Sequence, residues 1–482
     1  MEITIDMVII TVYLLVLLGI GFYASRKIKD SMDFSIAGRK IGFPILLGTL
    51  IGTSIGAAST MGKAGKAYEI GIALFFATMA YAVGLFIFGL IAPAIRRTGI
   101  WNIPDALFIR YGGGMRLAFA ITMVLSVTAL FGTQLIAVGL AITSMMGEFG
   151  ISYTEAILGA GIVMVLYTML GGLLAVAYTD FVQTIIMLAA VGILLPVFIV
   201  ADLGSTTTVA LLTPSADHFW GGLTAVYIVS IVLIDLPFSL IDPSLWQRAA
   251  AAKSSTTIRK SMFITSGVYV YWSFVVVFLG ITASHLFPEL GATKEGVDAA
   301  IPNLIVHYMP AGLKGLCLAA MMAIMMSTAD TVLLIAGTSF SRDIFQALRP
   351  RTEDRTLLSI ARGFILIIGV LGIVFALNMS GIFDLILLAF AIFVSGAFVP
   401  TIAALFWRRA TKAGAIVSSA TASLTVVALY GLKMAGMLPQ WVEPIIISIS
   451  LSFILMLGVS HMTYRPETAT PRLIDLGEQV DL

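Results

Sequence analysis

The chain has 482 residues, of which 59% are hydrophobic and 11% are charged. Soluble domains carry about 25% charged residues, so most of this chain is expected to lie in lipid. The net charge of +2 comes from basic residues dispersed among loops and gives no indication of nucleic-acid binding. The single cysteine, Cys317, excludes a disulfide framework and a multi-cysteine metal site, and we expect it to pack in an apolar helix.

Apolar segments of about 20 residues, the length needed to cross a bilayer, recur along the chain. They predict an all-α membrane protein with about thirteen transmembrane helices. The predicted spans are 6–25, 43–66, 70–95, 115–147, 152–174, 176–201, 220–250, 261–286, 310–340, 357–379, 381–407, 413–432 and 440–460. The first is interpreted as a retained helix, because it lacks the basic start and cleavage site of a signal peptide.

Basic residues fall mainly into alternate loops. An external N-terminus puts most of the 28 basic residues inside, Arg248 among them, and leaves Lys63, Lys66, Lys294, Lys314 and Lys433 outside. Since inner loops carry an excess of Lys and Arg, we predict the N-terminus outside and the C-terminus in the cytoplasm. The expected location is the plasma (cytoplasmic) membrane.

Two of the predicted helices carry signs of interruption. Residues 52–59 of the second are dense in glycine and hydroxyl groups, and the seventh contains Asp235-Leu-Pro237 and Asp242-Pro243. Proline removes a backbone donor and disfavours helix at the residue before it. Two interrupted helices five spans apart are typical of transporters built from inverted repeats, with the binding site at the breaks, although kinked packing helices are an alternative.

This pattern divides the chain into four parts. Residues 1–42 form an additional N-terminal helix and a cytoplasmic loop, and residues 43–219 form the first repeat of five helices. Residues 220–410 form the second repeat, and residues 411–482 form two C-terminal helices and a cytoplasmic tail. The first helix of each repeat is expected to be discontinuous.

Four aspartates are predicted at membrane depth, where a charge costs on the order of 3 kcal/mol. Asp180 and Asp242 lie near helix ends, where snorkelling or helix capping explains them equally well. Asp235 and Asp330 are deeper, and for them a functional role is favoured.

The ninth predicted helix carries a polar cluster. Spacings of three and four place Ser327, Asp330 and Thr331 on one face, with Thr328 beside them. Hydroxyls inside helices often only bond the preceding turn. A face that also holds a carboxylate is better explained by a hard cation, which needs several oxygen ligands.

Sequence motifs in the same order along nearly the whole chain resemble those of the sodium:solute symporter family. They are Ile103-Pro104-Asp105 before Arg110-Tyr111-Gly112, Tyr167-Thr168 with Gly171-Gly172, Tyr178-Thr179-Asp180 with Gln183, Trp246-Gln247-Arg248 with Ala252-Lys253, and Met326-Ser327-Thr328. Members of this family carry sugars, proline, choline, urea, pantothenate and other small solutes. The resemblance implies thirteen helices, the second to eleventh forming the inverted-repeat core named after a bacterial leucine transporter.

The resemblance also implies where sodium binds. Family members use two carbonyls at the first break, and one carbonyl and two hydroxyls on the eighth core helix; the matching positions here are Gly52, Ile55, Ile324, Ser327 and Thr328. Proline carriers have an aspartate near this break, where this chain has Ser54, so a weaker ligand set is implied.

Some members bind a second sodium ion, and the matching positions are Asp180, Asp330 and Thr331. Asp330 replaces a hydroxyl of the family pattern. Two carboxylates facing one cavity repel unless a cation or a proton lies between them. The expectation is therefore a second cation site or a proton-binding pair.

The sequence indicates less about the solute. Spacing from the Gln-Arg motif brings Asp235 to the family's sugar-contact position, and Ser59 is a weaker candidate contact. A carboxylate in the solute cavity favours an amino acid, a choline-like compound or a polyamine. The alternative is that Asp235 pairs with a protein group or lies outside the cavity.

We therefore expect a secondary active symporter that imports a small organic solute with sodium as the co-transported ion. A proton-coupled symporter is the near alternative, and a channel or receptor is less favoured. An enzyme is not expected, because the histidines lack metal-ligand spacing and no phosphate-binding loop occurs. The expected partners are the solute, sodium and the lipid bilayer, with neither nucleic acid nor an obligate protein partner.

Overall fold

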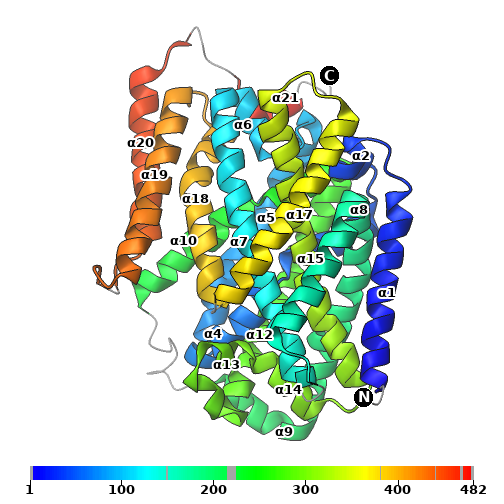
Figure 1. The fold of residues 1–482 in the computed structure, drawn as a ribbon. Coiled ribbons are helices and arrows are strands. Elements are labelled where there is room, and N and C mark those ends of the chain that lie inside the picture. Colours follow the sequence, from blue (N-terminus) through cyan, green and yellow to red (C-terminus); the bar gives the residue numbers. More distant parts are fainter. Residues whose placement is uncertain are drawn as a thin grey trace.

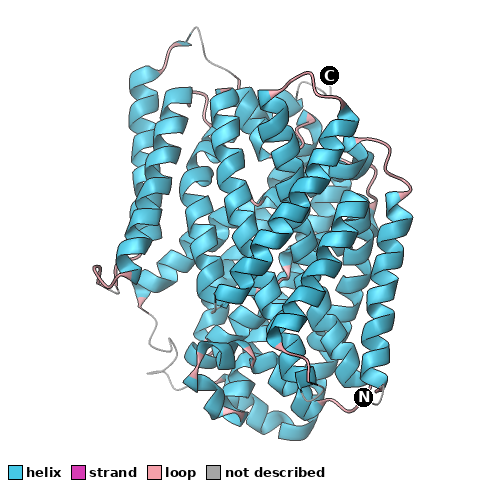
Figure 2. Cartoon of the chain, in the orientation of Figure 1, coloured by secondary structure: helices cyan, strands magenta, loops and turns pink. Residues whose placement is uncertain are grey.

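The computed structural model describes residues 4–147, 150–213, 224–379, 382–439, 441–466 and 471–478. Within these residues the regular structure is helical, and one isolated parallel bridge joins Ile41 and Ala252 (Figure 2). The predicted boundary between residues 219 and 220 and the end of the tail lie outside the described residues.

Helices of the first half of the chain include several short pieces between long spans. They are α1 Ile5–Ser25, α2 Ser31–Ile36, η1 Ala37–Arg39, α3 Phe43–Ser54, η2 Ala58–Gly62, α4 Lys63–Ile70, α5 Ala73–Thr98, α6 Ile103–Tyr111, α7 Gly113–Met146, α8 Tyr153–Met187, η4 Leu188–Leu194 and α9 Leu195–Leu212.

The second half repeats this mixture of long and short helices. They are α10 Ala225–Leu240, α11 Pro243–Ala251, α12 Ser255–Leu286, η6 Pro288–Ala292, α13 Lys294–Asp298, α14 Ala300–Tyr308, α15 Leu313–Ser339, η7 Phe340–Phe345, α16 Gln346–Leu348, α17 Asp354–Asn378, α18 Ile382–Phe406, α19 Lys412–Met434, α20 Pro444–Thr463 and α21 Leu473–Glu478.

The long helices run roughly side by side, with α1 at one edge and the α19–α20 pair at the other (Figure 1). Helix α15 lies at the centre, packed on α7, α8, α17, α1 and α3. The most apolar stretch of α15 is 94% buried, whereas that of α1 is 17% buried. Polar groups on α15 are therefore shielded from lipid and must find partners within the protein.

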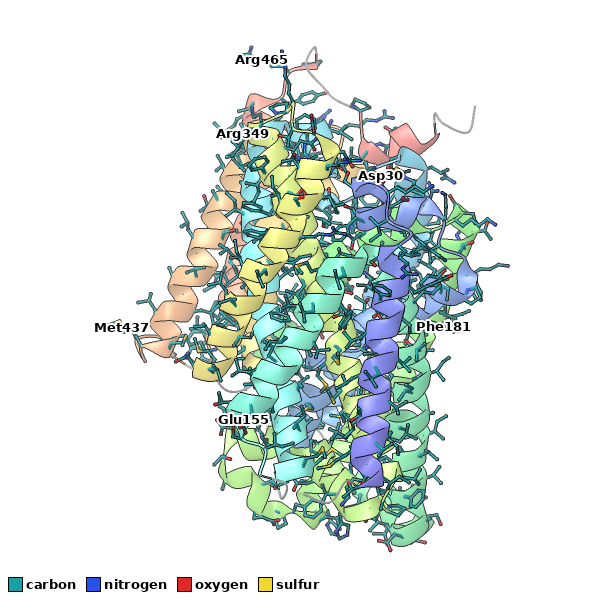
Figure 3. The ribbon with its side chains drawn as sticks, turned by 45° about the vertical axis from the view of Figure 1, so that its right-hand side comes forward. Asp30, Glu155, Phe181, Arg349, Met437 and Arg465 are labelled. Carbon is teal, nitrogen blue, oxygen red and sulfur yellow. The ribbon has the colours of Figure 1, made fainter. Side chains whose placement is uncertain are left out.

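The first and last described helices reach opposite ends of the molecule. The described chain begins at one end, and its last helix, α21, lies at the other (Figure 1). Figure 3 places three labelled residues, Asp30, Arg349 and Arg465, toward the same end as α21. Phe181 lies between the two ends, on the side of the helix bundle. Termini at opposite ends agree with an odd number of crossings.

Among the described residues, eleven helices are long and apolar enough to cross a membrane, or twelve if the bent pair at residues 43–54 and 58–70 is one span. They coincide with the predicted spans to within a few residues at most ends. One 60-residue helical stretch, Tyr153–Leu212, covers two predicted spans. A straight helix of that length would be about 90 Å long. It is interrupted at Gly172, whose φ of 53° and ψ of −159° are not helical.

The second predicted interruption is smaller than expected. Pro237 lies inside α10, which continues to Leu240, so the Asp235–Pro237 segment is not a break. Transmembrane helices tolerate proline where neighbours satisfy the freed backbone group. The chain leaves the helix only at Ile241 and Asp242, and Asp242 caps α11 by accepting hydrogen bonds from the Ser244 amide (2.8 Å) and hydroxyl (2.5 Å).

Candidate ion and solute sites

Helix α3 and the segment η2–α4 meet at a bend of 56°. Ile55 is extended (φ −110°, ψ 96°), and a π-helical turn follows from Ala58. Two side chains bond the amides freed by the break: Ser59 Oγ accepts from Gly56 N (2.9 Å), and Gln134 Oε1 accepts from Ala57 N (2.9 Å). The break is thus a built feature with its donors satisfied, as irregular backbone at membrane depth requires.

Helix α15 meets α3 at this break. Ser327 Oγ lies 2.8 Å from the Gly52 carbonyl oxygen and 3.2 Å from that of Ile324. Thr328 Oγ1 donates to the Thr53 carbonyl (3.4 Å). Three of the five residues predicted for the first sodium site, Gly52, Ile324 and Ser327, thus meet at the Ser327 hydroxyl, and Thr328, the fourth, bonds the neighbouring Thr53 carbonyl. Ile55, the fifth, lies at the start of the break. Its amide donates to the Ile51 carbonyl oxygen (3.1 Å).

The structure surrounds Asp180 with donors from other helices. Its Oδ2 accepts from Thr49 Oγ1 (2.5 Å) and from Arg248 Nη2 (3.3 Å). Arg248 also donates to Thr49 Oγ1 (2.9 Å) and to Thr331 Oγ1 (2.7 Å). Both charged side chains are fully buried. The loop position predicted for Arg248 is therefore wrong: α11 turns back into the protein after Asp242 and carries this guanidinium to Asp180.

Asp330 lies on the side of α15 that faces α8. It accepts hydrogen bonds from the hydroxyls of Tyr167 and of Thr168, the latter at 3.1 Å. Thr331, the next residue, instead contacts Thr53 Oγ1 (3.2 Å) and donates to Ser327 O (3.0 Å). The residues predicted for the second site therefore face two partners: Asp180 and Thr331 share Arg248, and Asp330 has its own hydroxyl pair.

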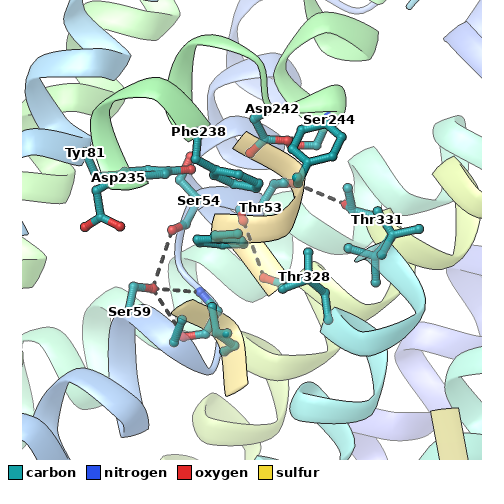
Figure 4. Close-up of a pocket in the computed structure, with 18 of the residues that line it drawn as sticks. Thr53, Ser54, Ser59, Tyr81, Asp235, Phe238, Asp242, Ser244, Thr328 and Thr331 are labelled. Carbon is teal, nitrogen blue, oxygen red and sulfur yellow. Dashed lines mark hydrogen bonds between the residues drawn. The ribbon is translucent and has the colours of Figure 1, made fainter. Parts of the chain in front are cut away.

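A cavity lined by residues of the break, α10 and α15, called here the central cavity, lies beside the break. Asp235 and Ser59, the predicted solute contacts, both line it, as do Thr328 and Thr331. Asp235 and Tyr81 lie on one side of this cavity and Thr328 and Thr331 on the other (Figure 4). Much of the remaining wall is aromatic, including Phe238 stacked on Phe390 at 3.6 Å between ring centroids.

Lys63 is a lining residue that the sequence did not reveal. The predicted topology puts it on the outer side, near the end of the predicted span 43–66, but its side chain is only 2% exposed and faces the cavity. The Nζ atom donates to Ser273 Oγ (2.9 Å) and Tyr269 Oη (3.4 Å), and it interacts electrostatically with Asp235. The break and the π-helical turn carry residue 63 inward at the start of α4, which a count of outer basic residues does not indicate. A lysine beside an apolar glycine-rich segment was the only signal.

A sequence profile of the sodium:solute symporter family matches residues 34–421, most of the chain. The chain belongs to the sodium:solute symporter family. Its members are transporters, which confirms that this symporter is not an enzyme and that sodium is the co-transported ion. A multi-pass membrane transporter of small solutes is likewise confirmed.

Several curated relatives align along most of this symporter. It is 26% identical to the Osmoregulated proline transporter OpuE of Bacillus subtilis, with 97% of each chain covered. It is 25% identical to the Sodium/glucose cotransporter of Vibrio parahaemolyticus, covering 86% of this chain and 82% of the relative.

The fold is shared with solved transporters. A structure of a Na⁺-coupled sialic acid symporter superposes with a TM-score of 0.79 at 19% identity and covers 97% of this chain and 99% of its own. A crystal structure of MhsT in complex with L-phenylalanine matches with a TM-score of 0.58 at 11% identity, over 91% of this chain and 98% of its own. At these identities the similarity supports the fold alone.

Proposed function

We propose that this symporter imports a small organic solute driven by the sodium gradient, and that ion and solute bind near the middle of the membrane. The single observation that carries the proposal is the Ser327 hydroxyl, which bonds both the Gly52 and the Ile324 carbonyl oxygens across the break. Carbonyl and hydroxyl oxygens at a broken helix are the ligands that transporters offer to sodium. Alternating access follows if these contacts differ between outward-open and inward-open states.

The proposed architecture has thirteen transmembrane helices and two inverted repeats, residues 43–219 and 220–410. The non-helical Gly172 supports dividing the 60-residue stretch into two spans, which adds one crossing to the twelve. The interruptions at residues 55–57 and 241–242 support a discontinuous first helix in each repeat. We further propose the plasma membrane, with the N-terminus outside and the C-terminus in the cytoplasm.

For the first sodium ion we propose Gly52, Ile55, Ile324, Ser327 and Thr328 as ligands. The bonds of Ser327 to the Gly52 and Ile324 carbonyls support three of the five positions, and the bond of Thr328 to the adjacent Thr53 carbonyl supports a fourth. For Ile55 the proposal rests on the family resemblance. All five would supply neutral oxygens, so the site should bind sodium weakly compared with one that includes a carboxylate.

For a second cation or a proton we propose Asp180, Asp330 and Thr331. The guanidinium of Arg248 pairs with Asp180, whereas the hydroxyls of Tyr167 and Thr168 that donate to Asp330 are neutral. The charge of the fully buried Asp330 is therefore left for a cation or a proton to balance. Asp180→Asn and Asp330→Asn are expected to change the sodium dependence, ion stoichiometry or pH dependence of uptake. If both variants retain all three, this second site does not exist.

For the solute we propose a cationic or zwitterionic compound, an amino acid, a choline-like compound or a polyamine, in contact with Asp235 and Ser59. Both side chains line the central cavity, which supports their candidacy. The similarity to a proline transporter adds weight to the amino acids.

The test is uptake by purified protein in proteoliposomes, screened over amino acids, quaternary amines, polyamines, sugars and carboxylates. Sodium coupling predicts concentrative, saturable uptake with an inward sodium gradient and none when potassium replaces sodium at fixed pH. Uptake that follows a pH gradient in potassium identifies the proton-coupled alternative. Non-saturable uptake that only equilibrates identifies a channel.

A further inference from the structure

Two side chains of opposite charge line the central cavity from different helices. Lys63 is the first residue of α4, after the break and the π-helical turn. Asp235 lies on α10, which ends at Leu240. They interact electrostatically and border the same space. Tyr269 holds the Lys63 ammonium in place with its hydroxyl (3.4 Å) and lies with its ring 4.8 Å from Nζ.

Other groups that could recognise a charged solute in this cavity are already engaged. The Gly56 and Ala57 amides at the break donate to the side chains of Ser59 and Gln134. A solute carboxylate must therefore displace these side chains or bind elsewhere. Asp242 accepts two bonds from Ser244 and interacts with the guanidinium of Arg248. Charge recognition in the cavity therefore falls to Lys63 and Asp235.

We infer that the solute is a zwitterionic amino acid with an apolar side chain, its carboxylate bound by Lys63 and its ammonium by Asp235. The apolar part packs against the aromatic wall formed by Phe238, Phe390 and Phe393. This inference rests on the proposed function and narrows its solute to one chemical class.

Electrostatics separates this solute from the other candidates. A choline-like compound or a polyamine would approach Asp235 with Lys63 beside it, and like charges in a desolvated site cost affinity. A carboxylic acid without an amino group meets the same penalty at Asp235. A zwitterion replaces one lysine–aspartate interaction with two ion pairs and leaves the cavity without an unbalanced charge.

Sodium-dependent thermal stabilisation of the purified full-length protein tests the inference with matched probes. The amino acids are L-proline, L-leucine and L-phenylalanine. The matched amines are pyrrolidine, isopentylamine and phenethylamine, and the matched acids are cyclopentanecarboxylate, 4-methylpentanoate and 3-phenylpropionate. At least one amino acid should half-saturate at a concentration at least tenfold below those of its amine and its acid. An amine or an acid that binds as well as its amino acid, or no binding of any probe, overturns the inference.

Two variants give a readout that a merely structural role cannot produce. In the Lys63→Met variant the matched amine should bind at least as well as its amino acid. In the Asp235→Asn variant the matched acid should bind at least as well as its amino acid. Equal weakening of all three compounds by both variants overturns the assignment. Lys66→Met, one turn along α4, and Asp202→Asn on α9 are the controls and should retain the wild-type order.

Failure of sodium coupling leaves a different trace. The amino acids would then stabilise the protein equally in sodium and potassium chloride, while the order of amino acid, amine and acid stays as inferred. A reversed order with sodium dependence intact instead contradicts only the solute class.

Discussion

Ser327 connects the two helices of the first ion site through one hydroxyl. Its Oγ contacts carbonyl oxygens on both α3 and α15. Ser327→Ala should raise the sodium concentration for half-maximal uptake about tenfold, because a lost ligand of this kind is worth about 1.5 kcal/mol. Sodium titration of solute uptake measures the shift. Thr265→Val removes a buried hydroxyl that bonds only its own helix and should leave the titration unchanged; equal shifts in both variants would remove Ser327 from the site.

Asp180 and Arg248 form a fully buried ion pair, which makes loss of one partner costly. Asp180→Asn or Arg248→Met should lower the free energy of unfolding by about 3–5 kcal/mol, because each leaves the other charge uncompensated. The double variant should recover part of that loss. Thermal unfolding in detergent measures all three.

The control for this pair is Lys66→Met, which breaks the exposed pair with Glu69, whose side chain is 44% exposed. Exposed pairs contribute up to about 1 kcal/mol, so the change should be small. Additive losses in the Asp180 and Arg248 double variant would show that the two side chains do not stabilise each other.

At the residue scale, the sequence predicted side chains that lie on regular helices and missed those that follow a break. Ser327 and Thr331 follow from helical spacing on α15. Lys63 and Arg248 come just after interruptions, where the direction of the chain depends on tertiary packing. Charge distribution alone counts both as cations at the membrane surface, whereas the structure buries both side chains.

At the scale of helices, α3 and α15 can meet because the break is glycine-rich. A Cβ on Gly56 would lie 2.5 Å from Thr328 Oγ1 and 3.2 Å from Gln134 Oε1. Gly56→Ala should therefore displace the Thr328 hydroxyl. It should raise the sodium concentration for half-maximal uptake by about as much as Ser327→Ala does, while the protein stays folded.

Gly19→Ala on α1 is the matched control, because its Cβ meets nothing within 4 Å. Uptake titrations and melting temperatures of both variants decide the matter. A Gly56→Ala protein with wild-type sodium dependence would mean that this close approach is not part of the ion site.

The helices themselves were largely predictable, since lipid requires about 20 apolar residues for each crossing. Pro237 shows where prediction from the sequence fails: proline predicts a break in the helix, yet this residue lies inside α10. The short helices α6 and α14 lie outside the predicted spans, and α11 was predicted only as the end of the span 220–250. They are held by packing and caps, which hydropathy does not detect.

At the scale of the whole molecule, three cavities follow one another toward the C-terminal end. Pro243 and Ile335 border both the central cavity and the second one, and Trp101, Thr338 and Arg342 border both the second and the third. The Arg342 guanidinium stacks on Trp101, 3.4 Å from the ring centroid, and pairs with Asp105 (3.5 Å). This stack lies between the second and third cavities, where a gate to the C-terminal side would act.

Trp101→Ala should increase access to this path. The Arg342 side chain is 27% exposed. A partly exposed cation–π contact is worth about 1 kcal/mol, so its loss can shift the open population by about fivefold. The readout is the rate at which a water-soluble maleimide labels Thr338→Cys in a Cys317→Ala background. Arg349→Ala, which removes an exposed contact with Phe345, is the control. Equal labelling with and without Trp101 would rule out the gate.

Solute-stimulated entry of radioactive sodium into proteoliposomes tests the central claim, that sodium bound at the α3 break drives this symporter. The wild-type protein should carry sodium inward only when a transported solute is present, and Ser327→Ala should reduce that flux at low sodium while Thr265→Val does not. Solute accumulation without sodium entry, or a sodium flux unchanged by Ser327→Ala, would contradict it.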